Sequence, residues 1–502
     1  MVHFRFDNSY AEQLSGFYVQ RSPDPVRGPA LLLFNRQLAG ELGLEADSES
    51  PLDLARLFSG NELPSGAVPL AQAYAGHQFG GFVPQLGDGR ALLLGEVLDV
   101  QNRRRDIALK GSGPTAFARG GDGKAAVGPV LREYLLGEAM HALGIPTTRG
   151  LAAVATGEPV FRERPLPGAV LTRVASSHIR VGTFQFFAAR QRFDQVQQLA
   201  DYVIARHFPE LLDASPEERY LDLLEAVARR QASLLARWML AGFVHGVMNT
   251  DNMAVSGETI DYGPCAFMEA YDPSAVFSSI DRGGRYAYEN QPLIARWNLA
   301  RLAETLLPLI NPDSIDTAIS QAANVVERFM PLYEAEWCKI ARAKLGLAQS
   351  EATQDDIDSD IDSDIDLARD WLKLLQEHAV DFTLGWRRLA DAVEPPAEGS
   401  APLFPTPAFE PWLARWRRRL NRQPGVAAEA ACVIRSHNPL YIPRNHLVEE
   451  ALAAATDSMD LLPLERLLEV VTDPCRDRPA EQRYAEPASR EFTACYRTFC
   501  GT

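Results

Sequence analysis

The sequence lacks any apolar run long enough to cross a bilayer, which takes about 20 consecutive residues. Its first residues, MVHFRFDNSYAEQL, contain no apolar stretch of the length that a secretory signal has, so we expect no such signal. Cysteine is scarce, because six cysteines are scattered over 502 residues without a C-x-x-C pair or the Cys/His spacing of a zinc site. This usage is typical of the reducing cytoplasm, and we expect a cytoplasmic protein with no membrane partner.

Basic residues are also fewer than acidic ones. Lys and Arg number 50 against 66 Asp and Glu, which gives a formal net charge of −16 and a pI of about 5.1. An acidic surface repels nucleic acid and anionic lipid, so we expect no nucleic-acid partner. A polyphosphate ligand is still compatible with this charge if local basic residues or a metal ion hold it.

No standard phosphate-binding loop is present. The run GGDGKAA at 120–126 has Ala125 where the Walker motif needs Ser or Thr, and we expect a flexible loop there. The run HGVMNTDN at 245–252 fits the kinase catalytic loop H-R-D-L-x-x-x-N at His245 and Asn252, but Val247 stands at the position of the catalytic Asp. The sequence therefore keeps the metal-binding Asn of a kinase loop and lacks its base.

Strand patterns come first along the chain, and helix patterns follow. We expect two strands around a glycine turn at 82–97, strands at 106–111 and 169–175, and a helix at 129–144 that ends before Pro146. A long amphipathic helix at 219–243 leads into the octapeptide, and 253–263 resembles a short hairpin. Further helices are expected at 290–345, 366–390 and 426–470.

This order indicates an α+β, protein-kinase-like two-lobed fold with N-terminal and C-terminal extensions. We expect the N-terminal extension at 1–65, the N-lobe at 66–178, the C-lobe at 179–393 and a helical C-terminal extension at 394–502. The run DDIDSDIDSDID at 355–366 lacks the Gly and the terminal Glu of a calcium loop, so we expect a solvated acidic insertion or the start of a helix. The Pro-rich stretch at 394–411 is expected to be a linker or surface loop.

Asn252 and Asp261 form the first candidate site. Asp261 opens D-Y-G at the position of the kinase D-F-G, and a hairpin between it and Asn252 would bring the two side chains together. A carboxylate and an amide oxygen are hard ligands suited to Mg²⁺ or Mn²⁺ when a nucleotide supplies further oxygens. Either residue alone would more often be a turn cap.

Basic residues supply the second candidate feature. Lys110 ends the strand IALK, where kinases place a phosphate-binding lysine, and the following helix carries Glu133 and Glu138, of which Glu133 is better placed to pair with it. Arg173 and Arg180 lie between the last N-lobe strand and the helical part. Surface ion pairs would explain two arginines equally well, but planar guanidinium groups in a cleft are natural partners for phosphate.

Long motifs resemble the selenoprotein O family of protein adenylyltransferase pseudokinases. They are AGHQFGGFVPQLGDGRALLLGE (75–96), ALKGSGPTAFARGGDGKAAVGPVLREYL (108–135), HGVMNTDNMAVSGETIDYGP (245–264) and NPLYIPRNHLVEEAL (438–452). The resemblance implies an enzyme that binds ATP in a flipped orientation and transfers AMP to Ser, Thr or Tyr hydroxyls of proteins, including itself. UMP transfer from UTP is the variant left open by the sequence.

The resemblance also implies roles for individual positions. Lys110 and Glu133 match the lysine–glutamate pair, Arg173 and Arg180 match arginines that hold the terminal phosphate, and Asp251 matches the proton acceptor. The metal ligands match Asn252 and Asp261, and further nucleotide contacts match Gly87, Gly89, Arg90, Asp122 and Gly123.

One implied feature lacks a matching residue in this chain. Family members can link a C-terminal cysteine to a cysteine of the activation segment, and Cys500 matches the tail position. The segment VFSSIDRGGRY at 276–286 has no cysteine, and Cys265 is the nearest candidate. Two other functions stay open, a γ-phosphoryl kinase that uses Asp251 as a displaced base and an inactive nucleotide-binding scaffold.

Overall fold

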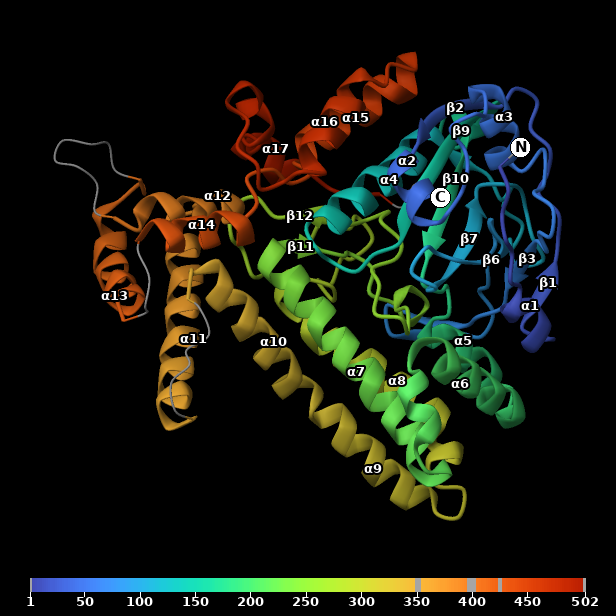
Figure 1. Cartoon of the computed structure of the whole chain (residues 1–502), viewed down its shortest axis with the longest axis horizontal. Coiled ribbons are helices and arrows are strands. Elements are labelled where there is room, and N and C mark those ends of the chain that lie inside the picture. Colours follow the sequence, from blue (N-terminus) through green and yellow to red (C-terminus); the bar gives the residue numbers. More distant parts are fainter. Residues whose placement is uncertain (1, 348–353, 395–402, 423–426, 500–502) are drawn as a thin grey trace.

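An antiparallel sheet forms one side of the molecule (Figure 1). The computed structural model describes residues 2–347, 354–394, 403–422 and 427–499. The eight-stranded sheet has the order β1-β3-β6-β7-β10-β9-β2, with β8 paired to β10. Its strands are β1 Tyr18–Gln20, β2 Ala30–Phe34, β3 Leu70–Gln72, β6 Ala91–Leu98, β7 Arg104–Lys110, β8 Ala125–Ala126, β9 Arg149–Phe161 and β10 Pro165–Ala175. Strands β1 and β2, from the expected N-terminal extension, thus belong to this sheet.

The sheet is buried on both faces, which explains its continuous apolar strands. One face packs against α2 (Arg36–Glu41) and α3 (Pro51–Ser59), and α4 (Val127–Ala142) covers the other. Helices α15 (Asn445–Ser458) and α16 (Leu462–Val471) pack over α4 in turn (Figure 1). Strands buried on both sides need apolar residues at successive positions, as in the run ALLLGEV of β6.

The register of β7 and β10 places basic residues on one face. Arg173 of β10 pairs with Ala108 of β7, and Leu171 pairs with Lys110. Because residues two apart in a strand share a face, Lys110 and Arg173 are diagonal neighbours across the two strands. Helix α4, which carries Glu133, covers that face.

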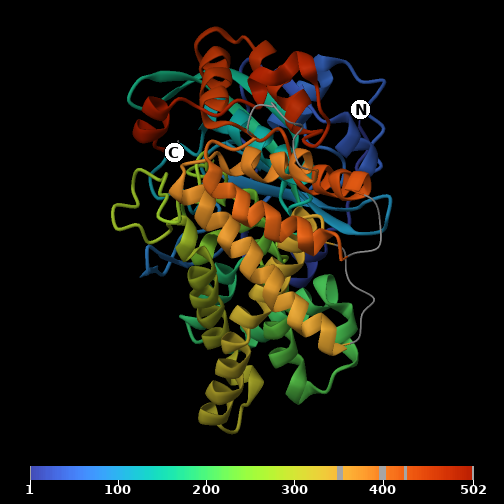
Figure 2. The ribbon, with the colours of Figure 1, turned by 90° about the vertical axis from the view of Figure 1, so that its left-hand side faces the viewer.

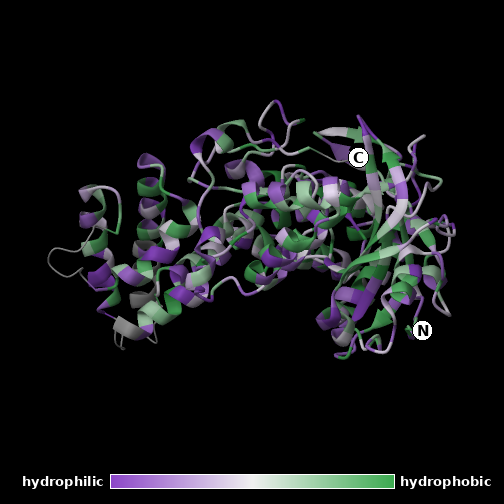
Figure 3. Ribbon diagram, turned by 90° about the horizontal axis from the view of Figure 1, so that it is seen from above, coloured by the Kyte–Doolittle hydropathy of each residue, from purple (hydrophilic) through white to green (hydrophobic). Residues whose placement is uncertain are grey.

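The second part of the chain is helical. Helices α7, α8 and α10 pack side by side below the sheet (Figures 1 and 2). Both the sheet and the helices carry hydrophobic and hydrophilic residues (Figure 3). The helices of this part are α5 Val181–Ala188, α6 Phe193–His207, α7 Pro216–Ala241, α8 Gln291–Ile310, α9 Ile315–Glu327, α10 Phe329–Lys344, α11 Gln354–Glu377 and α12 Phe382–Arg387.

A short strand pair fixes the octapeptide. Helix α7 ends at Gly242, whose φ of 72° reverses the chain, and β11 (Phe243–Val244) follows at once. Strand β11 pairs antiparallel with β12 (Ala266–Phe267). Residues 245–265 are therefore a loop held at both ends, and it faces the sheet.

The expected helices are confirmed, and so are the two strands expected around the glycine turn at 82–97, but these strands do not pair with each other, and residues 253–263 form no hairpin. Residues 81–83 form β5 (Gly81–Val83), which pairs with β4 (Gly76–Gln78), so Gly87 and Gly89 lie in a connection into β6 rather than at a hairpin turn. Residues 253–263 turn near Gly257, but the arms form bridges to Arg180 and Thr147 instead of each other. Strand β9 was not expected from the sequence.

The C-terminal part adds α13 (Glu410–Leu420), α14 (Ala427–His437) and α17 (Arg490–Cys495), and α1 (Ser9–Gln13) lies at the other end of the chain. The acidic run at 355–366 lies in α11, where Asp364 is buried and pairs with Arg419 at 2.8 Å. The expected linker at 394–411 lies partly outside the described residues. No helix in the described ranges is long and apolar enough to span a membrane.

Candidate functional site

The sequence-predicted residues gather in one cleft between the sheet and the helical part. Its volume of about 420 Å³ lies within the range of about 300–1,000 Å³ that is typical of small-ligand sites. The predicted positions that line it are Gly87, Gly89, Arg90, Lys110, Asp122, Gly123, Arg173, Arg180, Asp251, Asn252 and Asp261. Glu133 lies behind this lining and contacts two of its members.

Glu133 joins the two strand cations. Lys110 donates a hydrogen bond to Oε2 of Glu133, and Nη1 of Arg173 donates to Oε1 at 3.1 Å. Burial opposes ionisation of Glu133, but the charges of Lys110 and Arg173 hold its pKa below the usual value. Glu138 instead pairs with Arg149 at 2.6 Å, so the structure separates the two candidates as expected.

Arg180 is a buried cation at the inner wall of the cleft. Its guanidinium lies 4.2 Å from the centre of the Tyr74 ring and 3.5 Å from the Asp88 carboxylate. Its Nε is buried and has no hydrogen-bond partner among the described residues. Arg180 therefore lines the cleft with a rigidly held, planar guanidinium group that can still donate hydrogen bonds.

The loop 245–265 supplies the acidic and amide groups. Asn252 donates a hydrogen bond from Nδ2 to the carbonyl oxygen of Val247 at 3.1 Å. The side-chain oxygen of Asn252 is therefore free to coordinate a cation. Asp261 lies 3.8 Å from Lys110 and has a φ of 69°, a conformation that is unusual for a residue other than glycine. Nε2 of His245 donates to the carbonyl oxygen of Ile260 at 2.9 Å and so fixes the backbone beside Asp261.

A divalent metal ion fits these residues. The pKa of Asp261 is lowered: burial would raise it, but Lys110 and further cations outweigh that effect and keep the carboxylate ionised. Among the described residues no group of three His, Cys, Asp or Glu side chains could hold a metal on its own. Two oxygen donors at the edge of a cleft suit Mg²⁺ or Mn²⁺ bound together with phosphate, because Mg²⁺ usually keeps only one or two protein ligands.

Asp251 lies beside these ligands with an unsatisfied oxygen. Its Oδ2 accepts a 3.3 Å hydrogen bond from Gln78, whereas Oδ1 is buried without a partner among the described residues. Burial raises the pKa of Asp251 to about 6. A carboxylate of this basicity on a residue that lines the cleft can accept a proton from a hydroxyl group.

Two glycines allow the loops over the cleft to approach each other. A Cβ at Gly87, where φ is 76°, would lie 2.3 Å from the Phe117 ring. A Cβ at Gly123, where φ is 65°, would lie 2.2 Å from the backbone of Gly113. Asp122, next to it, is exposed at the outer rim, and its carboxylate already pairs with Arg162 at 2.8 Å.

The comparison with known families identifies the chain. The family model described as "Protein adenylyltransferase SelO" matches residues 1–472. The chain belongs to the SelO family. A relative from Chromobacterium violaceum, named "Protein nucleotidyltransferase YdiU", is 60% identical over 485 residues, which cover 96% of this chain and 98% of the relative.

Other SelO-family relatives carry the same name. One from Cereibacter sphaeroides is 60% identical over 502 residues, covering 99% of this chain and 100% of the relative. One from Rhizobium meliloti is 56% identical over 505 residues and covers 100% of both. The similarity thus extends over the whole chain.

The C-terminal tail of this SelO-family chain lies against the segment after D-Y-G. Thr498 forms a parallel bridge with Ser278 and donates from its hydroxyl to the carbonyl oxygen of Pro264 at 2.6 Å. Cys500, the implied disulfide partner, lies outside the described residues. Cys265 is buried, and burial raises its pKa to about 12, so it is a poor nucleophile for disulfide exchange.

Sequence reasoning missed several cleft residues. Tyr74 and Asp88 hold Arg180, Gln78 holds Asp251, and Arg162 holds Asp122. All but Arg162 lie in the SelO-family motif at 75–96 or one residue before it. In the sequence, glycines lie close to Tyr74, Gln78 and Asp88, and this pattern was the available sign of a binding loop. Only the fold shows which cation or carboxylate each of these residues contacts.

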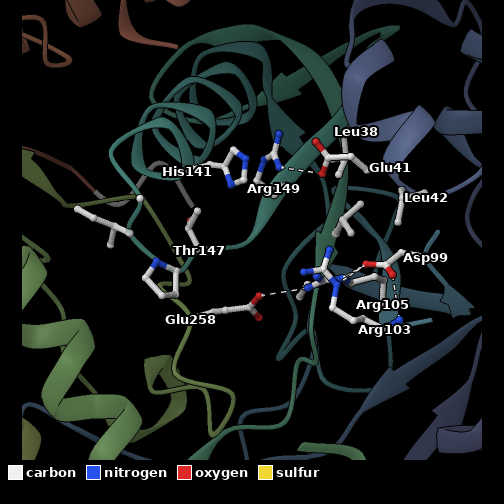
Figure 4. A pocket seen from close by; sticks show the side chains of 15 residues that line it. Leu38, Glu41, Leu42, Asp99, Arg103, Arg105, His141, Thr147, Arg149 and Glu258 are labelled. Atoms are coloured by element: carbon white, nitrogen blue, oxygen red, sulfur yellow. Dashed lines mark hydrogen bonds and ion pairs between the residues drawn. The ribbon is translucent and has the colours of Figure 1, made fainter. Parts of the chain in front are cut away.

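A second cavity, of about 340 Å³, lies at the C-terminal end of α4 (Figure 4). Its charges are paired with one another, since Arg149 lies 3.6 Å from Glu41, Arg105 lies 3.1 Å from Asp99, and Arg105 also lies 3.8 Å from Glu258. None of the predicted site residues lines it. The cleft with Lys110, and not this cavity, is therefore the candidate active site of this SelO-family chain.

Proposed function

We propose that the protein has a kinase-like two-lobed architecture and transfers AMP from ATP to Ser, Thr or Tyr hydroxyls of proteins, itself included. Membership of a family described as protein adenylyltransferases supports nucleotidyl transfer. UMP transfer from UTP uses the same chemistry and the same residues. The small number of cysteines in the sequence supports action in a reducing compartment such as the cytoplasm.

The observation that carries the proposal is the pair of guanidinium groups at the inner wall. Arg173 and Arg180 are 4% and 5% exposed and line the cleft beside Lys110, whereas Asp122 and its loop lie at the open rim. The cations thus lie deep, where a kinase would place adenine, and favour a triphosphate with its tail inward and its base outward. This orientation brings the α-phosphorus, and not the γ-phosphorus, towards Asp251.

The residues then have distinct roles. Asn252 and Asp261 hold Mg²⁺ or Mn²⁺, which neutralises phosphate charge when it is bound. Lys110, held by Glu133, binds the phosphates, and Arg173 and Arg180 hold the terminal one. The glycines at 87 and 89, with Arg90, Asp122 and Gly123, lie where the outer part of the nucleotide would contact the loops.

The transfer itself needs one proton acceptor. The acceptor hydroxyl gives its proton to the carboxylate of Asp251, its oxygen bonds to the α-phosphorus, and the bond from that phosphorus to the β-phosphate oxygen breaks. Pyrophosphate leaves, stabilised by the cations of the inner wall. Val247 can therefore replace the kinase Asp, because the base acts from a position four residues later.

Labelled ATP tests this function against the two alternatives. Incubation with ATP labelled at the α-phosphate or at the γ-phosphate is expected to give α-label on protein, including the enzyme itself. Protein-bound γ-label would indicate a kinase, and no label on any protein would indicate a scaffold. The Asp261→Ala variant should abolish α-labelling, whereas the matched change at the exposed Asp272 should not; labelling that survives in Asp261→Ala refutes the metal assignment.

A further inference from the structure

The rim of the cleft next to Asp251 carries exposed apolar side chains. Phe79 and Phe82 belong to the β4–β5 hairpin and are 37% and 41% exposed. Ile280, on the loop before α8, is 54% exposed. Phe79 and Ile280 both line the cleft mouth. Solvent-exposed aromatic groups at the entrance of a cleft are typical of binding surfaces.

The hairpin is attached directly to the loop that holds Asp251. The backbone N–H of His77 donates to Oγ1 of Thr250 at 2.7 Å, and that of Phe79 donates to Oδ1 of Asn249 at 3.1 Å. Gln78 donates to Asp251 itself at 3.3 Å. Phe79 has a φ of 51°, a strained value for an aromatic residue that the surrounding hydrogen bonds maintain. The apolar rim is thus fixed relative to the proposed base.

Positive charge lies beside this rim. Arg282 is exposed and Arg285 is half-buried, and neither forms an ion pair with a carboxylate in the described part of the chain. The nearby Asp281 uses both carboxylate oxygens to accept the backbone N–H groups of residues 285 and 286, at 2.9 and 2.7 Å. The Arg285 guanidinium lies 4.9 Å from the Trp297 ring centre, which holds it next to the hairpin. The protein has a net charge of −16, but these two arginines, which have no carboxylate partner, give this part of its surface a positive charge that attracts acidic groups.

We propose that Phe79, Phe82, Ile280, Arg282 and Arg285 form an acceptor-binding surface for a protein segment with an apolar residue and acidic residues next to the modified hydroxyl. The apolar side chain packs on the phenylalanines, the carboxylates face the arginines, and the hydroxyl reaches the carboxylate of Asp251. This inference rests on the proposed transferase function and specifies its protein substrate. A basic acceptor segment would be repelled by the like charges of Arg282 and Arg285, so the surface also selects against basic segments.

The test uses the whole chain and three peptides that differ only in flanking charge. Each peptide carries one tyrosine and one leucine, flanked by Asp, Gln or Lys. Transfer of α-label from ATP gives KM and kcat, and fluorescence anisotropy in the presence of a non-hydrolysable ATP analogue gives peptide affinity without chemistry. Arg285→Glu is compared with Arg388→Glu, the same charge change at the exposed arginine that directly follows α12 and does not line the cleft.

We expect wild-type protein to favour the Asp peptide and to lose this preference as salt is raised. Arg285→Glu should raise the KM and the dissociation constant for the Asp peptide by about three- to tenfold, as for reversal of a partly screened charge, and leave affinity for the ATP analogue and kcat unchanged. Arg388→Glu should match wild type. Phe82→Ser should weaken binding of all three peptides equally.

Other outcomes separate the two proposals. Labelling that shows no charge preference, or an Arg285→Glu variant that behaves like Arg388→Glu, overturns the acceptor surface and leaves the transferase function intact. Loss of ATP-analogue binding in Arg285→Glu also overturns it, because the residue would then be structural. Charge-selective peptide binding without transfer of label to any peptide supports the surface and contradicts the transferase function.

Discussion

Arg173 donates a hydrogen bond from Nη1 to Oε1 of Glu133 at 3.1 Å, so the carboxylate that holds Lys110 also holds an arginine. A single buried anion therefore orients both strand cations towards the cleft. If Glu133 formed an ion pair with Lys110 alone, it would fix only the lysine. In this chain it also fixes the guanidinium that we assign to the terminal phosphate.

Replacing Glu133 should disorder both cations at once. We expect Glu133→Gln to lower kcat/KM for ATP by about 100-fold or more, since breaking a buried ion pair is strongly unfavourable. Steady-state kinetics measure this effect. Glu138→Gln is the matched control on the same helix: it removes the ion pair with Arg149 and should lower the melting temperature, yet keep kcat/KM. Equal kinetic losses in both variants would mean that Glu133 acts only through stability.

Arg180 should matter for nucleotide binding and not for folding. We expect Arg180→Met to weaken ATP binding by at least about tenfold, because a phosphate loses a charged, planar donor in a buried site. AMP, which lacks the terminal phosphates, should bind both proteins alike in calorimetry. Arg190→Met removes an exposed arginine that lies 3.6 Å from the Phe186 ring outside the cleft, and should change neither affinity. A loss of AMP affinity equal to the loss of ATP affinity in Arg180→Met contradicts the terminal-phosphate assignment.

Gly76 should be required for the position of Asp251. A Cβ at residue 76 would lie 2.5 Å from Oδ1 of Asp251, closer than real contacts allow. We expect Gly76→Ala to displace the carboxylate and lower kcat by about tenfold to 100-fold, with little change in ATP affinity. In Gly81→Ala, on the same hairpin, the new Cβ meets only a backbone oxygen at 3.5 Å, so its kcat should stay close to wild type. Normal kcat in Gly76→Ala would remove Asp251 from the mechanism.

A buried lysine far from the cleft predicts a pH effect on stability. Burial lowers the pKa of Lys344 to about 7, whereas an unfolded lysine titrates near 10.5. Between these values the unfolded chain binds the proton and the folded chain does not, so the free energy of unfolding rises with pH. Below about pH 7 both forms are protonated, and the full penalty for a buried charge applies.

We therefore expect Lys344→Met to raise the melting temperature at pH 6–7 and to remove this part of the pH dependence between pH 7 and 9. Thermal unfolding at a series of pH values measures it. Lys339→Met, at an exposed position on the same helix, should leave the wild-type slope unchanged. A Lys344→Met variant with the wild-type slope would show that this amine is ionised in the folded protein at pH 9.

Local patterns were enough to predict the helices and most cleft residues, but not the strand pairing. Helix 129–144 carries its own stop signal in Gly144 and Pro146, and the continuous apolar run of β7 indicates a strand regardless of its neighbours. Pairing is decided by packing over long distances, so residues 81–83 pair with β4, while β6 pairs with β3 and β7. Turn residues such as Gly87 and Gly257 are compatible with both arrangements.

The same limit applies to the site. The spacing of Asn252 and Asp261 within one loop makes their proximity predictable, as does the strand-and-helix arrangement of Lys110 and Glu133. The contact between Asp251 and Gln78 joins segments 173 residues apart and has no local signal. The fit of a metal ion and a nucleotide at this site is in turn inferred from the donor groups that face the cleft.

The orientation of the bound nucleotide tests the central claim most directly. A crystal structure with a non-hydrolysable ATP analogue and Mg²⁺ should show the γ-phosphate in contact with Arg173 and Arg180, the metal ion on Asn252 and Asp261, and adenine at the outer rim near Gly123. Adenine buried beside Arg180, with the γ-phosphate pointing towards solvent, would contradict the account and favour a conventional phosphotransferase pocket.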